Sequence, residues 1–157
     1  RGNTARMTTS EMMPSLIVIG DLHASRLEKA LTHISHLIPF QASMIEQFQD
    51  DELSYVDMMT TRFAKLQDIL GSKIFPLLLT KLQENGNEDS TLDRLHKLEK
   101  LGILPSANEW IEMRELRNHL THEYPDNPEI LASNLNKAAE YSKSLIAFWK
   151  RLKARIK

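Results

Sequence analysis

Apolar residues recur at alternating spacings of three and four along nearly the whole chain. Because each residue turns an α-helix by about 100°, this spacing gathers apolar side chains on one helix face. The pattern is clear over 22–38, over about 50–83 and over 92–101. In the first of these segments it comprises Leu22, Leu27, Ala30, Leu31, Ile34, Leu37 and Ile38. The sequence therefore predicts an all-α protein, a single-domain bundle of about five helices that run up and down with short connections.

Residues that begin or interrupt helices divide the first half of the chain. Asp21 is of a type that caps helix N-termini, and it is predicted to cap the first helix. Pro39 has no N–H to donate, so it interrupts that helix before FQASMIEQF at 40–48 resumes as helix. Gly71 and Pro76 fall inside the long second segment, which we therefore expect to bend rather than to form a straight rod.

The second half carries its own start and stop signals. The polar stretch ENGNEDS at 84–90 is typical of a loop, and Thr91 then opens a leucine-rich helix. Gly102 is predicted at the C-terminal end of that helix. Ser106 is predicted to cap the next helix, and the final helix is predicted to start at Asn127 and run to the end of the chain.

The length of 157 residues fits one domain with a single core, since domains commonly contain about 100–200 residues. We expect residues 1–14 to form a flexible N-terminal leader and residues 15–157 to form the helical domain. The leader includes RGNTAR, which precedes Met7 and can be a remnant of expression.

Charge and cysteine content limit the possible functions. The formal net charge is −1, which argues against a protein that coats DNA through its overall charge. It leaves open an enzyme that meets RNA at one local site. The chain has no cysteine, which excludes disulfides and thiolate metal sites and makes the reducing cytoplasm the expected location. Uninterrupted apolar runs such as LIVI at 16–19 are too short to cross a bilayer, so no membrane partner is expected.

The stretch LIVIGDLHAS at 16–25 looks like a buried strand that ends in Gly-Asp-x-His, as in metal-dependent phosphoesterases. In that interpretation Asp21 and His23 would bind a metal ion. Such sites need further carboxylates and histidines from later strands of an α/β fold, and this chain has no later segment of that kind. We therefore interpret Asp21 as a helix cap and His23 as a residue of the first turn, and we expect neither a metal nor another cofactor.

The segment RNHLTHEY at 117–124 concentrates hydrogen-bonding groups near the end of a helix that Pro125 should terminate close to Tyr124. Asn118 and His122 are four residues apart and lie nearly on one face, and Arg114 extends this polar stripe by another four. The alternative interpretation is a solvated helix face with ordinary pairs between neighbouring turns.

Arg117 stands five residues before His122, an angular offset of about 140° on a helix. One helix therefore does not place Arg117 directly over His122. Two arrangements would bring the two side chains together. The long arginine side chain can curl toward the same solvent pocket, or it can meet His122 of a partner helix related by two-fold symmetry.

RNHLTHEY fits the pattern Arg-x4-His-x-Tyr with a polar residue directly after the arginine. That pattern resembles the motif of the HEPN superfamily of small helical proteins, and the added tyrosine resembles its HepT toxin branch. The segments RFAKLQDILGSKIFPLLL at 62–79 and LEKLGILPSANEWIEMRELRNHLTHEYPDNPE at 98–129 resemble the same branch. The resemblance thus covers most of the chain.

The resemblance implies a metal-independent endoribonuclease that acts as the toxin of a toxin–antitoxin system. It implies a symmetric homodimer in which two copies of Arg117 and His122 line one cleft that binds RNA. His122 would act as general acid or base, Arg117 would bind the phosphate, and Asn118 would orient either of them. Weaker candidates for contact with RNA are Arg114, His119 and Arg62.

In the HepT branch the tyrosine that corresponds to Tyr124 accepts AMP from a minimal nucleotidyltransferase, which serves as the antitoxin. The resemblance therefore implies such a partner and a modification site at Tyr124. A second interpretation is a non-catalytic HEPN module that binds nucleotide or serves as the partner subunit of a nucleotidyltransferase.

Overall fold

The computed structural model describes residues 8–82, 84, 90–120 and 127–156. In chain order the elements are α1 (Thr9–Ile34), a 3₁₀ turn η1 (Ser35–Leu37), α2 (Ala42–Ile45), α3 (Asp50–Ile69), a π-helical turn η2 (Leu70–Ile74), α4 (Phe75–Lys81), α5 (Thr91–Lys100), α6 (Ala107–Leu120) and α7 (Pro128–Ile156). All regular structure within these ranges is helical, which confirms the all-α prediction.

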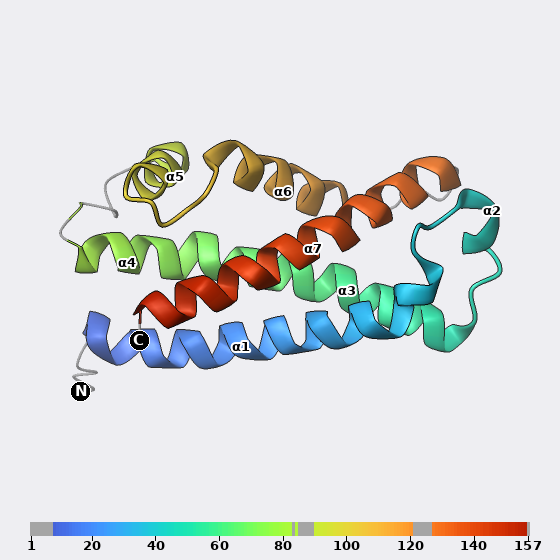
Figure 1. The fold of residues 1–157 in the computed structure, drawn as a ribbon, viewed down its shortest axis with the longest axis horizontal. Helices are drawn as coiled ribbons and strands as arrows, with labels where there is room; N and C mark the ends of the chain where they lie inside the picture. Colours follow the sequence, from blue (N-terminus) through green and yellow to red (C-terminus); the bar gives the residue numbers. More distant parts are fainter. Residues whose placement is uncertain (1–7, 83, 85–89, 121–126, 157) are drawn as a thin grey trace, which may run out of the picture.

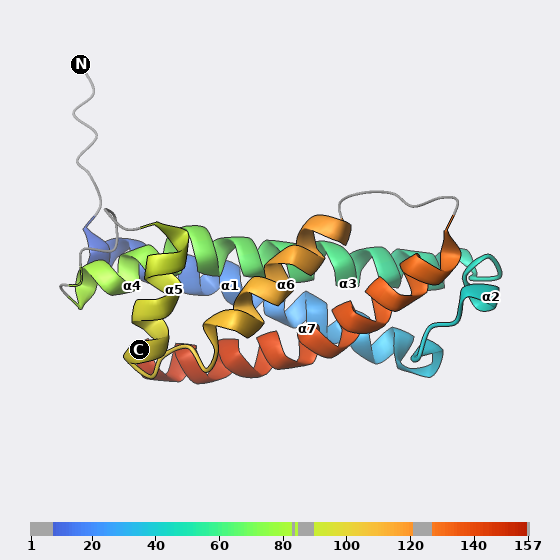
Figure 2. The same cartoon turned by 90° about the horizontal axis from the view of Figure 1, so that it is seen from above.

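The long helices form the body of the bundle. α1 and α3 lie side by side, and α7 packs obliquely across both (Figure 1). α6 packs on α7 and α3, and α5 packs against α4 and α6 at one end of the bundle (Figure 2). No helix in the described ranges is long and apolar enough to span a membrane.

α1 begins earlier than the sequence analysis predicted. Thr8 and Glu11 form a capping box, in which the Glu11 amide donates to Thr8 Oγ1 at 3.2 Å and the Thr8 amide donates to Glu11 Oε2 at 2.9 Å. Residues 9–14, assigned above to the leader, are therefore helical, and Met13 is buried. The prediction that Asp21 caps this helix is wrong, because the upstream box starts the helix and leaves Asp21 in its middle.

The Gly-Asp pair of LIVIGDLHAS joins α1 to α7. Asp21 Oδ1 accepts hydrogen bonds from Trp149 Nε1 at 2.8 Å and from Lys153 Nζ at 2.9 Å. A Cβ atom at Gly20 would lie closer than 3.0 Å to the indole ring of Trp149, which is 1% exposed. Gly20 therefore permits the close approach of the two helices, and the strand interpretation of this stretch does not hold.

The segment after Pro39 is less helical than predicted. α1 gives way to η1 before Pro39, as expected, but 40–48 contains only the single turn α2. The backbone of Phe40 bonds to the side chain of Asn136 on α7, with the Phe40 amide donating to Oδ1 at 2.6 Å and Nδ2 donating to the Phe40 carbonyl at 3.0 Å. The N–H and C=O of Phe40 are therefore bonded to Asn136 and do not form the backbone hydrogen bonds of a continuous helix.

The long segment from 50 to 81 is interrupted where Gly71 and Pro76 predicted. α3 passes into the π-helical turn η2, and α4 follows with Pro76 in its first turn. Pro76 has no N–H to donate to a residue one turn earlier, so the regular helical hydrogen bonding is already interrupted where the π-helical turn η2 lies.

The later helices begin where the sequence analysis predicted. Ser90, Ser106 and Asn127 each accept a hydrogen bond at 3.1 Å from the backbone N–H three residues on, at the starts of α5, α6 and α7. Gly102 follows α5 with a φ of 72°, a left-handed conformation suited to glycine at a helix end. Most of the loop predicted at 84–90 lies outside the described residues.

The core follows the predicted stripes except at four exposed leucines, Leu22, Leu53, Leu92 and Leu101. Its largest fully buried side chains include Trp149, Phe63, Phe75, Leu27, Ile34 and Leu98. Leu22 was predicted to face the core, but it is 44% exposed. At about 100° per residue Leu22 lies on the side of α1 opposite the buried Ala24 and Leu27, so it faces away from the core.

Candidate functional site

Arg117 lies in the last described turn of α6 and faces α3. Its Nη2 donates to Asp68 Oδ2 at 2.7 Å, and its Nη1 donates to Asn118 Oδ1 at 3.3 Å. The side chain of Arg117 is 30% exposed, and its buried Nε has no hydrogen-bond partner in the described part of the chain. The guanidinium is thus anchored through Nη1 and Nη2, and its Nε is a buried donor that the described residues leave without a partner.

The remaining faces of α6 divide as its sequence predicted. Met113 and Leu116 are buried, whereas Arg114 and Asn118 are exposed on the polar stripe. The bond from Arg117 to Asn118 turns the guanidinium toward this stripe.

His122 and Tyr124 lie outside the described residues, together with the rest of 121–126. The predicted end of the helix near Tyr124 falls in the same stretch. The position of the histidine relative to Arg117 therefore stays a prediction.

His119 is an exposed residue that faces a different part of the molecule. It lines an apolar groove of about 180 Å³ with Leu120, Leu131 and side chains of α3. This groove does not include Arg117, Asn118 or Arg114.

Arg62 also lies away from Arg117. It belongs to α3, but its Nη1 donates at 3.0 Å to Nδ1 of His23 on α1. Burial, followed by the positive charges of Arg62 and its neighbours, lowers the pKa of His23 below its ordinary value of 6.5. The neutral imidazole is therefore the form that accepts this hydrogen bond.

Asp21 and His23 do not form a metal site together. Asp21 bonds to α7, whereas His23 bonds to α3, so the two side chains leave α1 in different directions. Among the described residues, no group of three histidine, aspartate or glutamate side chains is arranged to hold a metal ion.

Sequence reasoning missed two residues on α3. Asp68, the partner of Arg117, is separated from it by 49 positions, and nothing in the local sequence marks it. Gln67 is 4% exposed although its side chain is polar. A signal for Gln67 was present, because it stands four after Phe63 and three before Leu70 and so falls on the apolar face.

Gln67 and Asp68 line a cavity of about 150 Å³, here called the α3–α6 pocket. Its walls come from α3, η2, α4, α5 and α6. They consist of Gln67, Asp68, Gly71, Ser72, Phe75, Thr91, Arg94, Leu95, Trp110 and Arg114.

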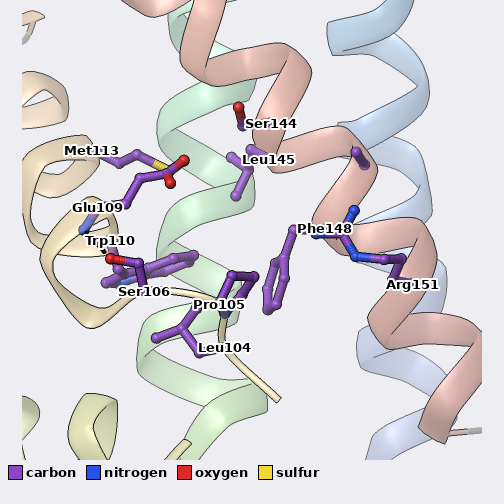
Figure 3. A pocket seen from close by; sticks show the side chains of 11 residues that line it. Leu104, Pro105, Ser106, Glu109, Trp110, Met113, Ser144, Leu145, Phe148 and Arg151 are labelled. Carbon is purple, nitrogen blue, oxygen red and sulfur yellow. Dashed lines mark hydrogen bonds between the residues drawn. The ribbon is translucent and has the colours of Figure 1, made fainter. Parts of the chain in front are cut away.

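A second cavity, of about 270 Å³, lies between the start of α6 and α7 (Figure 3). Trp110, Pro105 and Phe148 form mainly apolar walls, with Arg151 at the α7 side (Figure 3). Arg117 is not among its lining residues, so this cavity is separate from the motif.

No protein-family model matches this sequence, and no curated protein or solved structure matches it either. Arg117, Arg114 and Asn118 offer guanidinium and amide donors within two turns of one helix, an arrangement suited to binding phosphate.

Proposed function

We propose that this protein is a metal-independent endoribonuclease of the HEPN type and the toxin of a toxin–antitoxin system. The observation that supports it best is the position of Arg117, whose guanidinium lies at the surface beside Asn118 near the end of α6. His122 follows five residues later in the Arg-x4-His-x-Tyr pattern. The proposal thus combines a phosphate-binding group with a side chain that exchanges protons near neutral pH.

In the proposed reaction the 2′-oxygen of RNA attacks the adjacent phosphorus. The new P–O2′ bond forms while the P–O5′ bond breaks, which leaves a 2′,3′-cyclic phosphate and a free 5′-hydroxyl. His122 removes the proton of the 2′-hydroxyl as general base, and water supplies the proton that the departing 5′-oxygen takes up. Arg117 binds the non-bridging oxygens, where negative charge develops.

The proposed enzyme is a homodimer with a shared cleft. Within one helix Arg117 and His122 are offset by about 140°, so they point away from each other. In a two-fold dimer, Arg117 of one subunit can face His122 of the other. Two copies of each residue then surround one scissile phosphate. Asn118 orients the guanidinium, to which it is already bonded.

We further propose that a minimal nucleotidyltransferase neutralises the toxin by transferring AMP to Tyr124. The adenylate adds bulk and negative charge two residues from His122, so it blocks RNA and competes for Arg117. Co-expression with such an enzyme followed by mass spectrometry tests this step. AMP on Tyr124 is the expected result, and AMP at another residue or at none contradicts it.

A non-catalytic module that partners a nucleotidyltransferase is the second candidate. The ion pair between Arg117 and Asp68 favours it, because the carboxylate already neutralises the guanidinium that a ribonuclease needs. The pair is largely solvent-accessible, however, and such pairs contribute only about 0–1 kcal/mol. An RNA phosphate can therefore displace or share it.

Cleavage of RNA in excess chelator separates the two candidates. The wild type should cleave, whereas Arg117→Ala and His122→Ala should each lose about 10²–10⁴-fold in rate. Arg26→Ala on α1 is the matched control and should keep full activity. Cleavage that survives both motif substitutions would eliminate the catalytic assignment, and cleavage abolished by chelator would contradict the metal-independent mechanism.

A further inference from the structure

The α3–α6 pocket contains a buried amide that the fold itself does not use. Gln67 is 4% exposed, and within the described ranges its Nε2 has no hydrogen-bond partner. A buried donor without a partner destabilises a fold, and apolar side chains of similar size were available at this position. Gln67 lines the α3–α6 pocket, so its side-chain amide is the polar group that α3 contributes there beside Asp68.

The pocket also carries positive charge from two helices. Arg114 lines it from α6, and Arg94 lines it from α5, where its Nη2 donates to Thr91 Oγ1 at 3.5 Å. The one carboxylate in its wall, Asp68, is paired with Arg117. Arg114 makes no hydrogen bond or ion pair with the described residues. The lining therefore favours an anion.

Two backbone features add to this preference. Thr91, the first residue of α5, lines the pocket, and the N-terminal end of a helix carries partial positive charge. Ser72, in the π-helical turn η2, also lines the pocket. Turns of this kind are frequent at functional sites.

We propose that the α3–α6 pocket binds a phosphoryl group. Donors reach it from α3, α5 and α6, and a tetrahedral anion accepts hydrogen bonds from several directions, whereas a carboxylate accepts them within one plane. The volume of about 150 Å³ suits one such group. It is below the ~300–1,000 Å³ of pockets that enclose a whole small-molecule ligand.

The phosphoryl group has two possible sources, a free phosphate or the backbone of RNA. Asp68 lines the pocket and also holds Arg117, so the pocket adjoins the arginine of the motif. A strand whose scissile phosphate lay at Arg117 would carry a neighbouring phosphate to this pocket. This second source rests on the proposed function, whereas the binding of phosphate itself does not.

Titration with inorganic phosphate, followed by NMR of the side-chain amides, tests the proposal directly. The Gln67 amide signals, identified by their loss in Gln67→Met, should shift saturably with phosphate and not with chloride at equal ionic strength. Arg114→Gln should weaken binding by about tenfold, the loss expected for one charge-assisted hydrogen bond.

Two variants control for general effects. Ser142→Ala removes another buried side-chain atom without a partner in the described residues, but it lies on α7 and outside the pocket. Arg26→Gln removes an exposed charge on α1. Both should bind phosphate as the wild type does. Absence of a saturable shift, or equal affinity in Arg114→Gln, would overturn the proposal.

Competition with a short 2′-O-methyl RNA, which cannot undergo cleavage by its 2′-oxygen, identifies the source. Displacement of phosphate by this RNA supports the backbone as the occupant. Phosphate binding that this RNA leaves unchanged supports free phosphate. Because neither experiment measures cleavage, a failure of the pocket and a failure of the ribonuclease proposal are distinguishable.

Discussion

The guanidinium of Arg117 donates to the carboxylate of Asp68 across 2.7 Å and so ties the end of α6 to α3. The side chains are 30% and 53% exposed, so solvent reaches both partners. An RNA phosphate that binds Arg117 must share the guanidinium with this carboxylate or replace it. In the proposed ribonuclease the pair would therefore oppose RNA binding more than it stabilises the fold.

Asp68→Asn should consequently bind RNA more tightly. With a 2′-O-methyl RNA at low salt we expect affinity to rise about three- to fivefold, and the difference should shrink as salt increases. Fluorescence anisotropy measures both effects. Glu28→Gln is the matched control, because it removes a carboxylate paired with Lys150 at 3.2 Å elsewhere on the surface. Weaker binding by Asp68→Asn would contradict the prediction.

Gly20→Ala should destabilise the protein although alanine is the better helix former. The new methyl group would lie too close to the buried indole of Trp149, and overpacking of this kind costs about 1–3 kcal/mol. At Gly71 the nearest atom to a new Cβ is 3.7 Å away, so Gly71→Ala should be neutral or stabilising by up to about 1 kcal/mol. Urea unfolding of both variants compares them, and equal loss of stability in both would show that the clash is not the cause.

The pH dependence of stability should carry a contribution from His23. Its pKa in the folded protein is lowered below 6.5, so the unfolded chain binds this proton first as the pH falls. The free energy of unfolding should therefore decrease below about pH 6.5, until the pH passes the lowered folded value. Above that window His23 is neutral in both states and contributes no slope.

Urea midpoints at about pH 7.5 and 5.5 measure this effect. His23→Gln keeps an acceptor for Arg62 but cannot be protonated, so the midpoint should change less between the two conditions. His96→Gln, at an exposed position on α5, should behave as the wild type. A midpoint that changes as much in His23→Gln as in the wild type between the two pH values would contradict the prediction.

Local sequence signals predicted the elements whose boundaries depend on nearby residues. Ser106 and Asn127 cap their helices through hydrogen bonds three residues on, and Gly102 supplies the positive φ after α5. The predictions were wrong where contacts between residues far apart in the sequence determine the structure. Asp21 is typical of a cap but bonds to Trp149, 128 positions away. The helix expected over 40–48 is shortened where α7 bonds to the Phe40 backbone.

The candidate site shows the same division. The motif identified Arg117 and its neighbour Asn118, which the structure joins by a hydrogen bond. Asp68 was missed because no local pattern links it to α6. Arg62 was a weaker candidate from its place beside Phe63 on the long second helical segment, but its partner is His23 on another helix. Helical periodicity assigns a residue to a face, and only packing determines which helix that face meets.

Mixing two inactive variants is the most direct test of the shared cleft. Arg117→Ala and His122→Ala are prepared separately, unfolded and refolded together, and assayed for RNA cleavage in chelator. About half of randomly paired dimers then combine one of each subunit and hold an intact arginine and histidine across the two-fold axis. We predict that each variant alone is inactive and that the mixture regains cleavage. A mixture as inactive as its parents would contradict a site built from both subunits.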